Sequence, residues 1–186
     1  MPMLGVTVAI IDGSQVLLTK REDFEVWCLP GGAVDEGESV AAAAIREARE
    51  ETGLEVELTR LVGIYSRPKG WRSTHLILFA ARIVGGALRP DPREVVEVGY
   101  FGSGTLPAPL LAGHRQQILD VISGVGGNVW SYEVAWPFAP NITRQELYAL
   151  RDQSGLARQE FYIQHMLAVG GEKMALELDG ASQDVV

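Results

Sequence analysis

The stretch Gly32–Leu54, GAVDEGESVAAAAIREAREETGL, decides how the rest of the chain is interpreted. It predicts a glycine-containing turn followed by a helix with a strongly acidic face. Glu47, Glu50 and Glu51 stand at i, i+3 and i+4, so a helix brings them to neighbouring positions on one surface. Like charges about 5 Å apart repel by roughly 1 kcal/mol per pair in water and roughly 3 kcal/mol near a protein surface. This face therefore needs positive charge.

Two explanations for the acidic face are open at this point. Arg46 supplies one positive charge through its i, i+4 spacing to Glu50, and the remaining charge could simply be solvated. One guanidinium does not neutralise three carboxylates, however. A divalent cation would, because Mg²⁺ prefers carboxylate oxygens and keeps waters and substrate phosphates in its remaining positions.

The spacing across the whole stretch argues against an acidic face that arose by chance. Written as a pattern, it reads G-x5-E-x7-R-E-A-x-E-E-x-G-L. Charged residues or glycine occupy seven of these positions, and a chance match at one register is of order 10⁻⁸ to 10⁻⁹ from average residue usage. The pattern resembles the Nudix box in full, with Ala48 as a small occupant of its aliphatic position.

The resemblance implies both a fold and a reaction. The fold is α+β, an α/β/α sandwich in which helices flank a mixed β-sheet. The reaction is hydrolysis of a pyrophosphate bond in a nucleoside diphosphate linked to another group X, by water attack at phosphorus with Mg²⁺ or Mn²⁺ as cofactor. Nucleoside triphosphates, nucleotide sugars and ADP-ribose-type compounds are the expected substrates.

Carried over position by position, the resemblance also assigns catalytic residues. Glu50, Glu51 and the carbonyl of Gly31 are expected to ligate the metal. Glu47 is expected either as a further ligand or as the base that takes the proton from water. Arg46 is expected to orient the carboxylates by hydrogen bonding.

The remaining motif positions are expected to be structural. These are Gly32, Glu38 and Gly53, with an outer metal contact as an alternative role for Glu38. Relatives often take a further base or ligand from a segment well after the box. Glu94 is expected in that catalytic role, with Glu97 as the second choice.

The connector Ser66–His75 is unusually basic for this acidic chain. We expect its cations to meet substrate phosphates and an aromatic ring to stack on a base, although a solvated hairpin tip would have the same composition. The expected substrate-binding residues are Arg21, Arg67, Lys69, Trp71 and Arg72.

Composition limits the remaining classes of function. The 186 residues carry a net charge of −8, which argues against nucleic acid as a partner and disfavours an RNA-end hydrolase. Cys28 is the only cysteine and is expected as a buried filler. No serine stands in a G-x-S-x-G setting, which argues against a hydrolase triad. No apolar run is long enough to span a bilayer and the first residues lack a basic region, so a cytoplasmic protein is expected.

Hydrophobic spacing predicts the elements around the box. Strands are expected at 6–11, 16–20, 56–65, 76–83 and 94–101, and helices at 39–52 and 113–123. In the first helix the side chains expected to face inward are Ala44, Ile45 and Ala48. In the second they are Ile118, Val121 and Ile122.

The resemblance leaves the last part of the chain uncovered. We expect a Nudix domain at 1–126, a helical extension at 127–179 and a disordered tail at 180–186. Helices are expected after a capping box at Thr143 and over 157–169. The aromatic residues of the extension favour packing on the domain or a homodimer interface over a mobile lid. A non-catalytic nucleotide sensor is the alternative function, but such modules lose box carboxylates, and here all are present.

Overall fold

The computed structural model describes residues 2–69, 73–167 and 172–180. Within these residues the strands form one nine-stranded mixed sheet. The strands are β1 (Met3–Asp12), β2 (Gln15–Arg21), β3 (Trp27–Cys28), β4 (Gly31–Ala33), β5 (Leu54–Arg67), β6 (Thr74–Gly86), β7 (Val95–Phe101), β8 (Asn128–Val134) and β9 (Glu172–Leu178). Their order is β3-β2-β1-β6-β5-β8-β9, with β4 paired to β1 and β7 to β2. The pairs β1–β6 and β5–β8 are parallel, which makes the sheet mixed.

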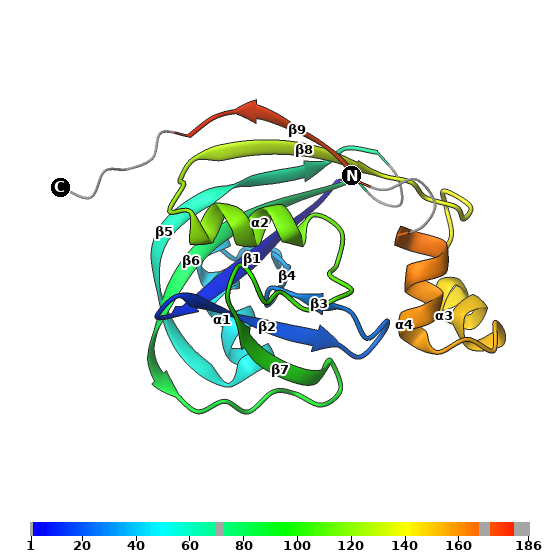
Figure 1. The fold of residues 1–186 in the computed structure, drawn as a ribbon, viewed down its shortest axis with the longest axis horizontal. Coiled ribbons are helices and arrows are strands. Elements are labelled where there is room, and N and C mark those ends of the chain that lie inside the picture. The colour runs from blue at the N-terminus through cyan, green and yellow to red at the C-terminus, as the bar shows by residue number, and fades with distance from the viewer. Residues whose placement is uncertain (1, 70–72, 168–171, 181–186) are drawn as a thin grey trace.

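Helices cover both faces of this sheet (Figure 1). Because side chains alternate along a strand, β1 sends Val8 to one face and Ala9 to the other. Val8 packs with the buried alanines of α1 (Val40–Thr52), and Ala9 belongs to the cluster that holds Ile118 of α2 (His114–Ile122). The α/β/α sandwich predicted from the sequence is therefore confirmed.

The box helix begins and ends where the sequence predicts. The Ser39 hydroxyl accepts a hydrogen bond from the Ala42 N–H at 3.1 Å, which caps the first turn. Gly53 adopts the left-handed conformation, with φ 76°, and its N–H donates to the Arg49 carbonyl at 2.8 Å. These caps set where α1 begins and ends, and the packing of Ala43, Ala44 and Ala48 in the core sets the direction in which its glutamates point.

Two expected core residues are exposed instead. Ile45 is 42% exposed because the buried face of α1 centres on Ala44 and Ala48, whose small side chains let the helix lie close to the sheet. Ile122 is 38% exposed, since it is the last residue of α2 and lies beside the buried stripe, which runs from His114 through Ile118 to Val121. Both predictions of an inward position were wrong.

The extension is only partly helical, contrary to expectation. It contains α3 (Arg144–Gln153), α4 (Arg158–Tyr162) and a π-helical turn, η1 (Ile163–Leu167), but also β8 and β9. Trp130 and Tyr132, at i and i+2, both pack against the core cluster beside α2, which is strand periodicity. Part of the predicted second helix (168–169) and residues 181–186 of the predicted disordered tail (180–186) lie outside the described residues, whereas Gly180 is described and its N–H donates to Asn128 Oδ1 at 2.7 Å.

A buried carboxylate ties β8 to the rest of the sheet. Asp120 of α2 accepts hydrogen bonds from Tyr65 Oη at 2.6 Å, Trp130 Nε1 at 2.8 Å and Asn128 Nδ2 at 3.2 Å. Three donors from two strands thus satisfy a side chain that would be costly to bury alone.

The helical part of the extension packs on the β2–β3 loop. Phe24 and Val26 of that loop share a core cluster with Leu147, Phe161 and Tyr162. The helices of the extension thus contact the domain in this structure, while the role of the extension, dimerisation and a domain boundary near residue 127 stay predictions. Among the described residues, no helix has the length and apolar character needed to cross a membrane.

Candidate functional site

The turn before α1 brings backbone and carboxylate very close together. A Cβ on Gly32 would lie 2.4 Å from Glu47 Oε1, and one on Gly31 would lie 2.2 Å from the Val6 carbonyl oxygen. At Gly31 the close atoms belong to the backbone, so no side chain fits there, whereas a side chain at Gly32 would displace the Glu47 carboxylate. The glycines therefore allow the acidic face of α1 to rest directly on β4.

One guanidinium organises the acidic face. Arg46 Nη1 donates to Glu47 at 2.7 Å and to Glu50 at 3.0 Å. Its Nε and Nη2 bond both oxygens of Glu38, at 3.0 and 2.9 Å, and Nη2 also reaches the Ala33 carbonyl at 3.1 Å. The planar fork of arginine suits this arrangement, which fixes the carboxylates in place. The expected orienting role of Arg46 has the geometry it requires.

Glu51 is the most deeply placed carboxylate of the cluster. It is 8% exposed, and its Oε2 accepts a hydrogen bond from the Gly31 N–H at 3.2 Å. Burial raises the pKa of Glu51 to about 8; Arg21 and the Gly31 N–H oppose the shift, and the charges of Glu47 and Glu94 add to it. The positive charge around this carboxylate is too small to offset the cost of burying its ionised form.

Glu47 and Glu50 differ in environment. Burial raises the pKa of Glu47 against the hydrogen bond from Arg46, and the nearby charges of Glu50 and Glu94 raise it further. The Glu50 side chain is 56% exposed. The cluster therefore grades from a buried acid at Glu51 to a solvated one at Glu50.

The donor set fits a hard divalent cation. Mg²⁺ and Mn²⁺ take carboxylate and carbonyl oxygens, and these are the groups that face the turn. Among the described residues, no three acidic, histidine or cysteine side chains are placed so that they could hold a metal ion together. The raised pKa values of Glu47 and Glu51 nevertheless mean that uncompensated negative charge gathers here. A cation would supply the missing compensation.

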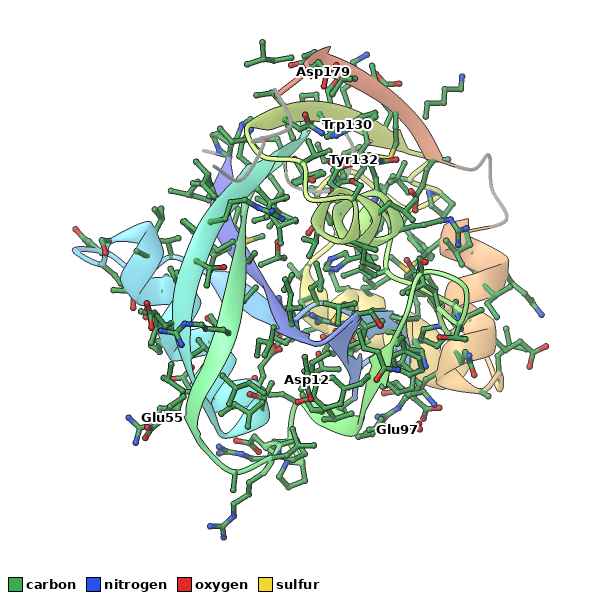
Figure 2. All side chains as sticks on the ribbon, turned by 60° about the vertical axis from the view of Figure 1, so that its left-hand side comes forward. Asp12, Glu55, Glu97, Trp130, Tyr132 and Asp179 are labelled. Atoms are coloured by element: carbon green, nitrogen blue, oxygen red, sulfur yellow. The ribbon has the colours of Figure 1, made fainter. Side chains whose placement is uncertain are left out.

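The structure distinguishes the two candidates for a later base. Glu94 directly precedes β7, and its carbonyl accepts a hydrogen bond from the Glu22 N–H at 2.8 Å. Its charge acts on both Glu47 and Glu51. Glu97 instead pairs with Lys20 at 3.5 Å and is 58% exposed, at the edge of the molecule (Figure 2). The placement favours Glu94, whose catalytic role stays a prediction.

Arg21 lies close to the cluster but is held by another residue. Its Nε and Nη2 donate to the two carboxylate oxygens of Asp23, at 2.9 and 2.6 Å. Its charge also lowers the pKa of Glu51. The expected substrate-binding position of Arg21 is thus beside the acidic helix face.

The basic connector lies elsewhere. Lys69 pairs with Glu133 of β8 at 2.6 Å, and Arg67 Nη2 donates to Thr74 at 3.4 Å. These two contacts are with β8 and β6. Trp71 and Arg72 fall outside the described residues, so the substrate-binding role of all four side chains stays a prediction.

Two sets of residues near the site were missed by the sequence analysis. Thr7, opposite Gly31 in the sheet, donates to Gln117 Oε1 at 2.8 Å, and the buried Gln117 Nε2 has no hydrogen-bond partner in the described part of the chain. Asp23 and Tyr148 form the second set, through the contact with Arg21. A polar residue beside an amphipathic stripe, or a contact across 125 residues, leaves no local signal in the sequence.

Comparison with known proteins points to one family. A family model described as NUDIX domain matches residues 1–121. A Bacillus subtilis (strain 168) protein named "Putative 8-oxo-dGTP diphosphatase" is 38% identical over 117 residues, 63% of this chain and 77% of that protein. An ADP-ribose pyrophosphatase of Methanocaldococcus jannaschii is 33% identical over 131 residues, 68% of this chain and 76% of that protein. The crystal structure of a MutT NUDIX hydrolase from Burkholderia pseudomallei superposes with a TM-score of 0.61 at 29% identity, covering 65% of this chain and 98% of that one.

Proposed function

The chain belongs to the Nudix family of hydrolases, and from this premise we propose that it hydrolyses a pyrophosphate bond in a nucleoside diphosphate-X compound, with Mg²⁺ or Mn²⁺ as cofactor. One observation carries the proposal. Glu47 and Glu50 are gathered on one guanidinium, and the buried Glu51 beside them lacks compensating charge. A site of this kind is suited to a cation and a polyanionic substrate.

Each box residue has a defined task in this proposal. Glu47, Glu50, Glu51 and the Gly31 carbonyl would hold the cation, which when bound supplies the positive charge that substrate phosphates and the leaving phosphate require. Arg46 keeps the carboxylates in register through its hydrogen bonds to Glu47 and Glu50.

The proton of the attacking water needs an acceptor. Glu47 is one candidate, since burial raises its pKa toward the range in which a carboxylate acts as a general base. Glu94, whose charge acts on the same cluster, is the other. Glu47→Gln separates the roles: loss of turnover at unchanged metal affinity supports a base, and weakened metal affinity supports a ligand.

The substrate phosphates have a cationic neighbour in Arg21. Its charge acts on Glu51, so an anion bound at the carboxylate cluster would lie within its influence. The names of the two relatives favour a nucleoside triphosphate or ADP-ribose as the substrate type, among the wider class of nucleoside diphosphate-X compounds.

A non-catalytic nucleotide sensor is the alternative function. Retention of every box carboxylate weighs against it, because a module that only binds has no use for a base and a metal-activated water.

A substrate panel tests the proposal. The protein is incubated with nucleoside triphosphates including 8-oxo-dGTP, with ADP-ribose and with nucleotide sugars, in Mg²⁺, Mn²⁺ or chelator, and release of phosphate, pyrophosphate and nucleoside monophosphate is measured. Hydrolysis of at least one compound that depends on the metal and is lost in Glu51→Gln is the expected result. Tight nucleotide binding without hydrolysis under any condition would favour the sensor.

A further inference from the structure

Helices α3 and α4 form hydrogen bonds with the loop that joins β2 to β3. Arg158 donates to the carbonyl of Glu22 at 2.8 Å, and Arg151 donates to the carbonyl of Asp23. The hydroxyl of Tyr148 donates to Asp23 Oδ2 at 3.0 Å. Arg151 is 5% exposed, so this contact is part of a packed interior rather than a surface ion pair.

The Asp23 carboxylate connects these helix–loop contacts to Arg21. Its Oδ1 accepts from Arg21 Nε and from the Phe24 N–H, both at 2.9 Å, and its Oδ2 accepts from Arg21 Nη2 at 2.6 Å and from Tyr148. Burial opposes ionisation of Asp23, but the hydrogen bonds from Arg21 and Tyr148 outweigh it and keep the pKa below its ordinary value. A bidentate pair of this kind fixes the plane of a guanidinium.

The fixed guanidinium keeps one edge unused. Among the described residues, the hydrogen bonds of Arg21 run only through Nε and Nη2 to Asp23, so Nη1 remains for another acceptor. In the sheet Arg21 pairs with Val95 of β7, and the N–H of the next residue, Glu22, donates to the Glu94 carbonyl at 2.8 Å. Arg21 therefore lies next to Glu94, the candidate base, on the side of the sheet edge where the substrate phosphates are proposed to bind.

We propose that α3, which lies beyond the matched domain, is part of the active-site framework: Tyr148 and Asp23 position Arg21 so that its free edge faces the substrate phosphates. This inference rests on the proposed function, since it assigns a phosphate contact to the same site. Tyr148 and Asp23 are positioning residues, because they act through Arg21.

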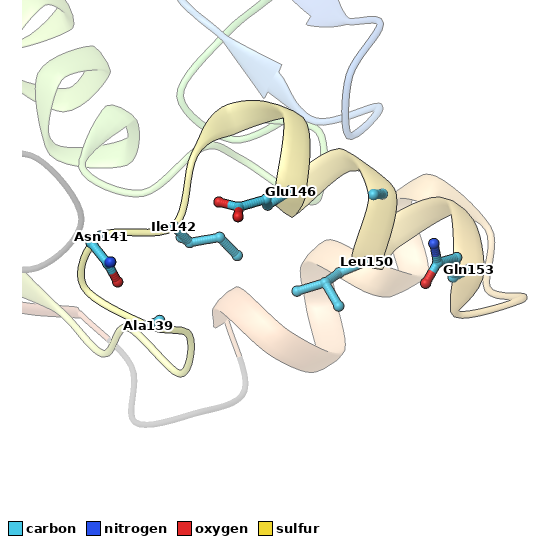
Figure 3. Close-up of a pocket in the computed structure, with 7 residues that line it drawn as sticks. Ala139, Asn141, Ile142, Glu146, Leu150 and Gln153 are labelled. Atoms are coloured by element: carbon cyan, nitrogen blue, oxygen red, sulfur yellow. The ribbon is translucent and has the colours of Figure 1, made fainter.

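The two faces of α3 differ in a way that agrees with this role. Tyr148 and Arg151 face the β2–β3 loop, and the Arg151 guanidinium lies 4.6 Å from the Tyr148 ring. Figure 3 shows the other side of the helix, where Glu146, Leu150 and Gln153 line a hollow. The face of α3 that carries Tyr148 and Arg151 is thus the one that contacts the β2–β3 loop.

Tyr148→Phe is the sharpest test, because it removes one hydroxyl and retains the ring packing on Arg151 and on Phe24. We expect kcat/KM to fall about threefold to tenfold, mainly through a higher KM, since a misaligned guanidinium binds phosphate less well. In the Arg21→Ala background the same substitution should have no further effect, because coupled residues are non-additive.

Tyr162→Phe is the matched control. Tyr162 is a more deeply buried tyrosine of the same helical unit, and its hydroxyl accepts a hydrogen bond from the Ala112 N–H at 3.0 Å. Its kcat/KM should stay within about twofold of the parent in the same cycle. Circular dichroism and thermal unfolding check that all variants are folded.

The outcomes separate the inference from the proposed function. The positioning role would be overturned if Tyr148→Phe lowered kcat/KM by the same factor in the Arg21→Ala background as in the parent. A fall in kcat at constant KM would overturn it as well. If the parent hydrolyses nothing in the panel, the proposed function fails, and the same cycle is measured as calorimetric binding of inorganic pyrophosphate with Mg²⁺. Coupled weakening then supports the inference, whereas no pyrophosphate binding, or weakening that is independent of Arg21, contradicts it.

Discussion

The acidic face of α1 and the support of Arg21, which consists of Asp23 and Tyr148, are neighbouring regions built in opposite ways. The contacts of the first are local in sequence: Arg46 bonds Glu38 and Glu50 across 8 and 4 residues. Those of the second are distant, since Tyr148 reaches Asp23 across 125 residues. A contiguous pattern can encode the first region, whereas only the folded chain assembles the second.

The two regions also differ in electrostatic balance. In the support, Arg21 and Tyr148 hold the pKa of the buried Asp23 below its ordinary value. In the acidic face, burial raises the pKa of Glu51 to about 8 despite Arg21 nearby. The support is internally neutralised and suited to hold a geometry, while the acidic face is left short of positive charge and suited to receive it.

The largest expected effect comes from removing charge at the acidic face. Glu50→Gln or Glu51→Gln should lower kcat by about a thousandfold or more, because each removes a proposed metal ligand while keeping the side-chain shape. Steady-state turnover with saturating Mg²⁺ measures it, with circular dichroism as the check on folding. Metal-dependent activity close to that of the parent in either variant would remove that residue from the proposed metal site.

The uncompensated charge should also appear as pH-dependent stability. The folded pKa of Glu51, about 8, lies above its ordinary value of 4.5, so the stability from its protonated form is complete below pH 4.5 and is lost as the pH rises through 8. Between pH 6 and pH 9 the metal-free protein should lose roughly 2–3 kcal/mol from this group.

Denaturant unfolding in chelator at the two pH values measures that loss. Glu51→Gln should be less sensitive to pH by the same amount, and Mg²⁺ should restore stability to the parent at pH 9 because it binds only the folded state. Equal pH dependence in the parent and the variant would mean that the carboxylate is already compensated.

Arg46→Lys tests whether the geometry of the guanidinium matters beyond its charge. Lysine keeps the charge but cannot bond Glu38 with two nitrogens and reach Glu47 at the same time. We expect kcat/KM to fall about tenfold, as for other residues that orient metal ligands. Activity equal to that of the parent would show that charge alone suffices at this position.

The sequence predicted the region whose contacts are local. The start of α1 at Ser39, its end at Gly53 and the position of the glutamates follow from capping residues and spacing. Ile45 was misplaced because hydrophobicity alone favours isoleucine in the core, whereas close packing on the sheet selected the small Ala44 and Ala48.

The contacts that depend on distant segments were not predictable in this way. β8 is a short strand, and its pattern of side chains alone does not predict where it lies. Its place in the sheet depends on pairing with β5, which includes Tyr65, and on hydrogen bonds to Asp120. In the sequence Asp23 is the last of four consecutive charged residues, 20–23. Its role depends on Tyr148, and nothing near residue 23 in the sequence indicates that partner.

The smallest expected effect separates the stability of α3 from its contact with the loop. The Thr143 hydroxyl caps α3 by accepting from the Glu146 N–H at 3.2 Å, and the Glu146 carboxylate accepts from the Thr143 N–H at 2.8 Å. Thr143→Ala should cost about 1 kcal/mol of stability. It leaves the bond from Tyr148 to Asp23 in place, so kcat and KM should not change. If Thr143→Ala instead raised KM as much as Tyr148→Phe, general loosening of α3 would explain both variants, and the hydroxyl of Tyr148 would have no specific role.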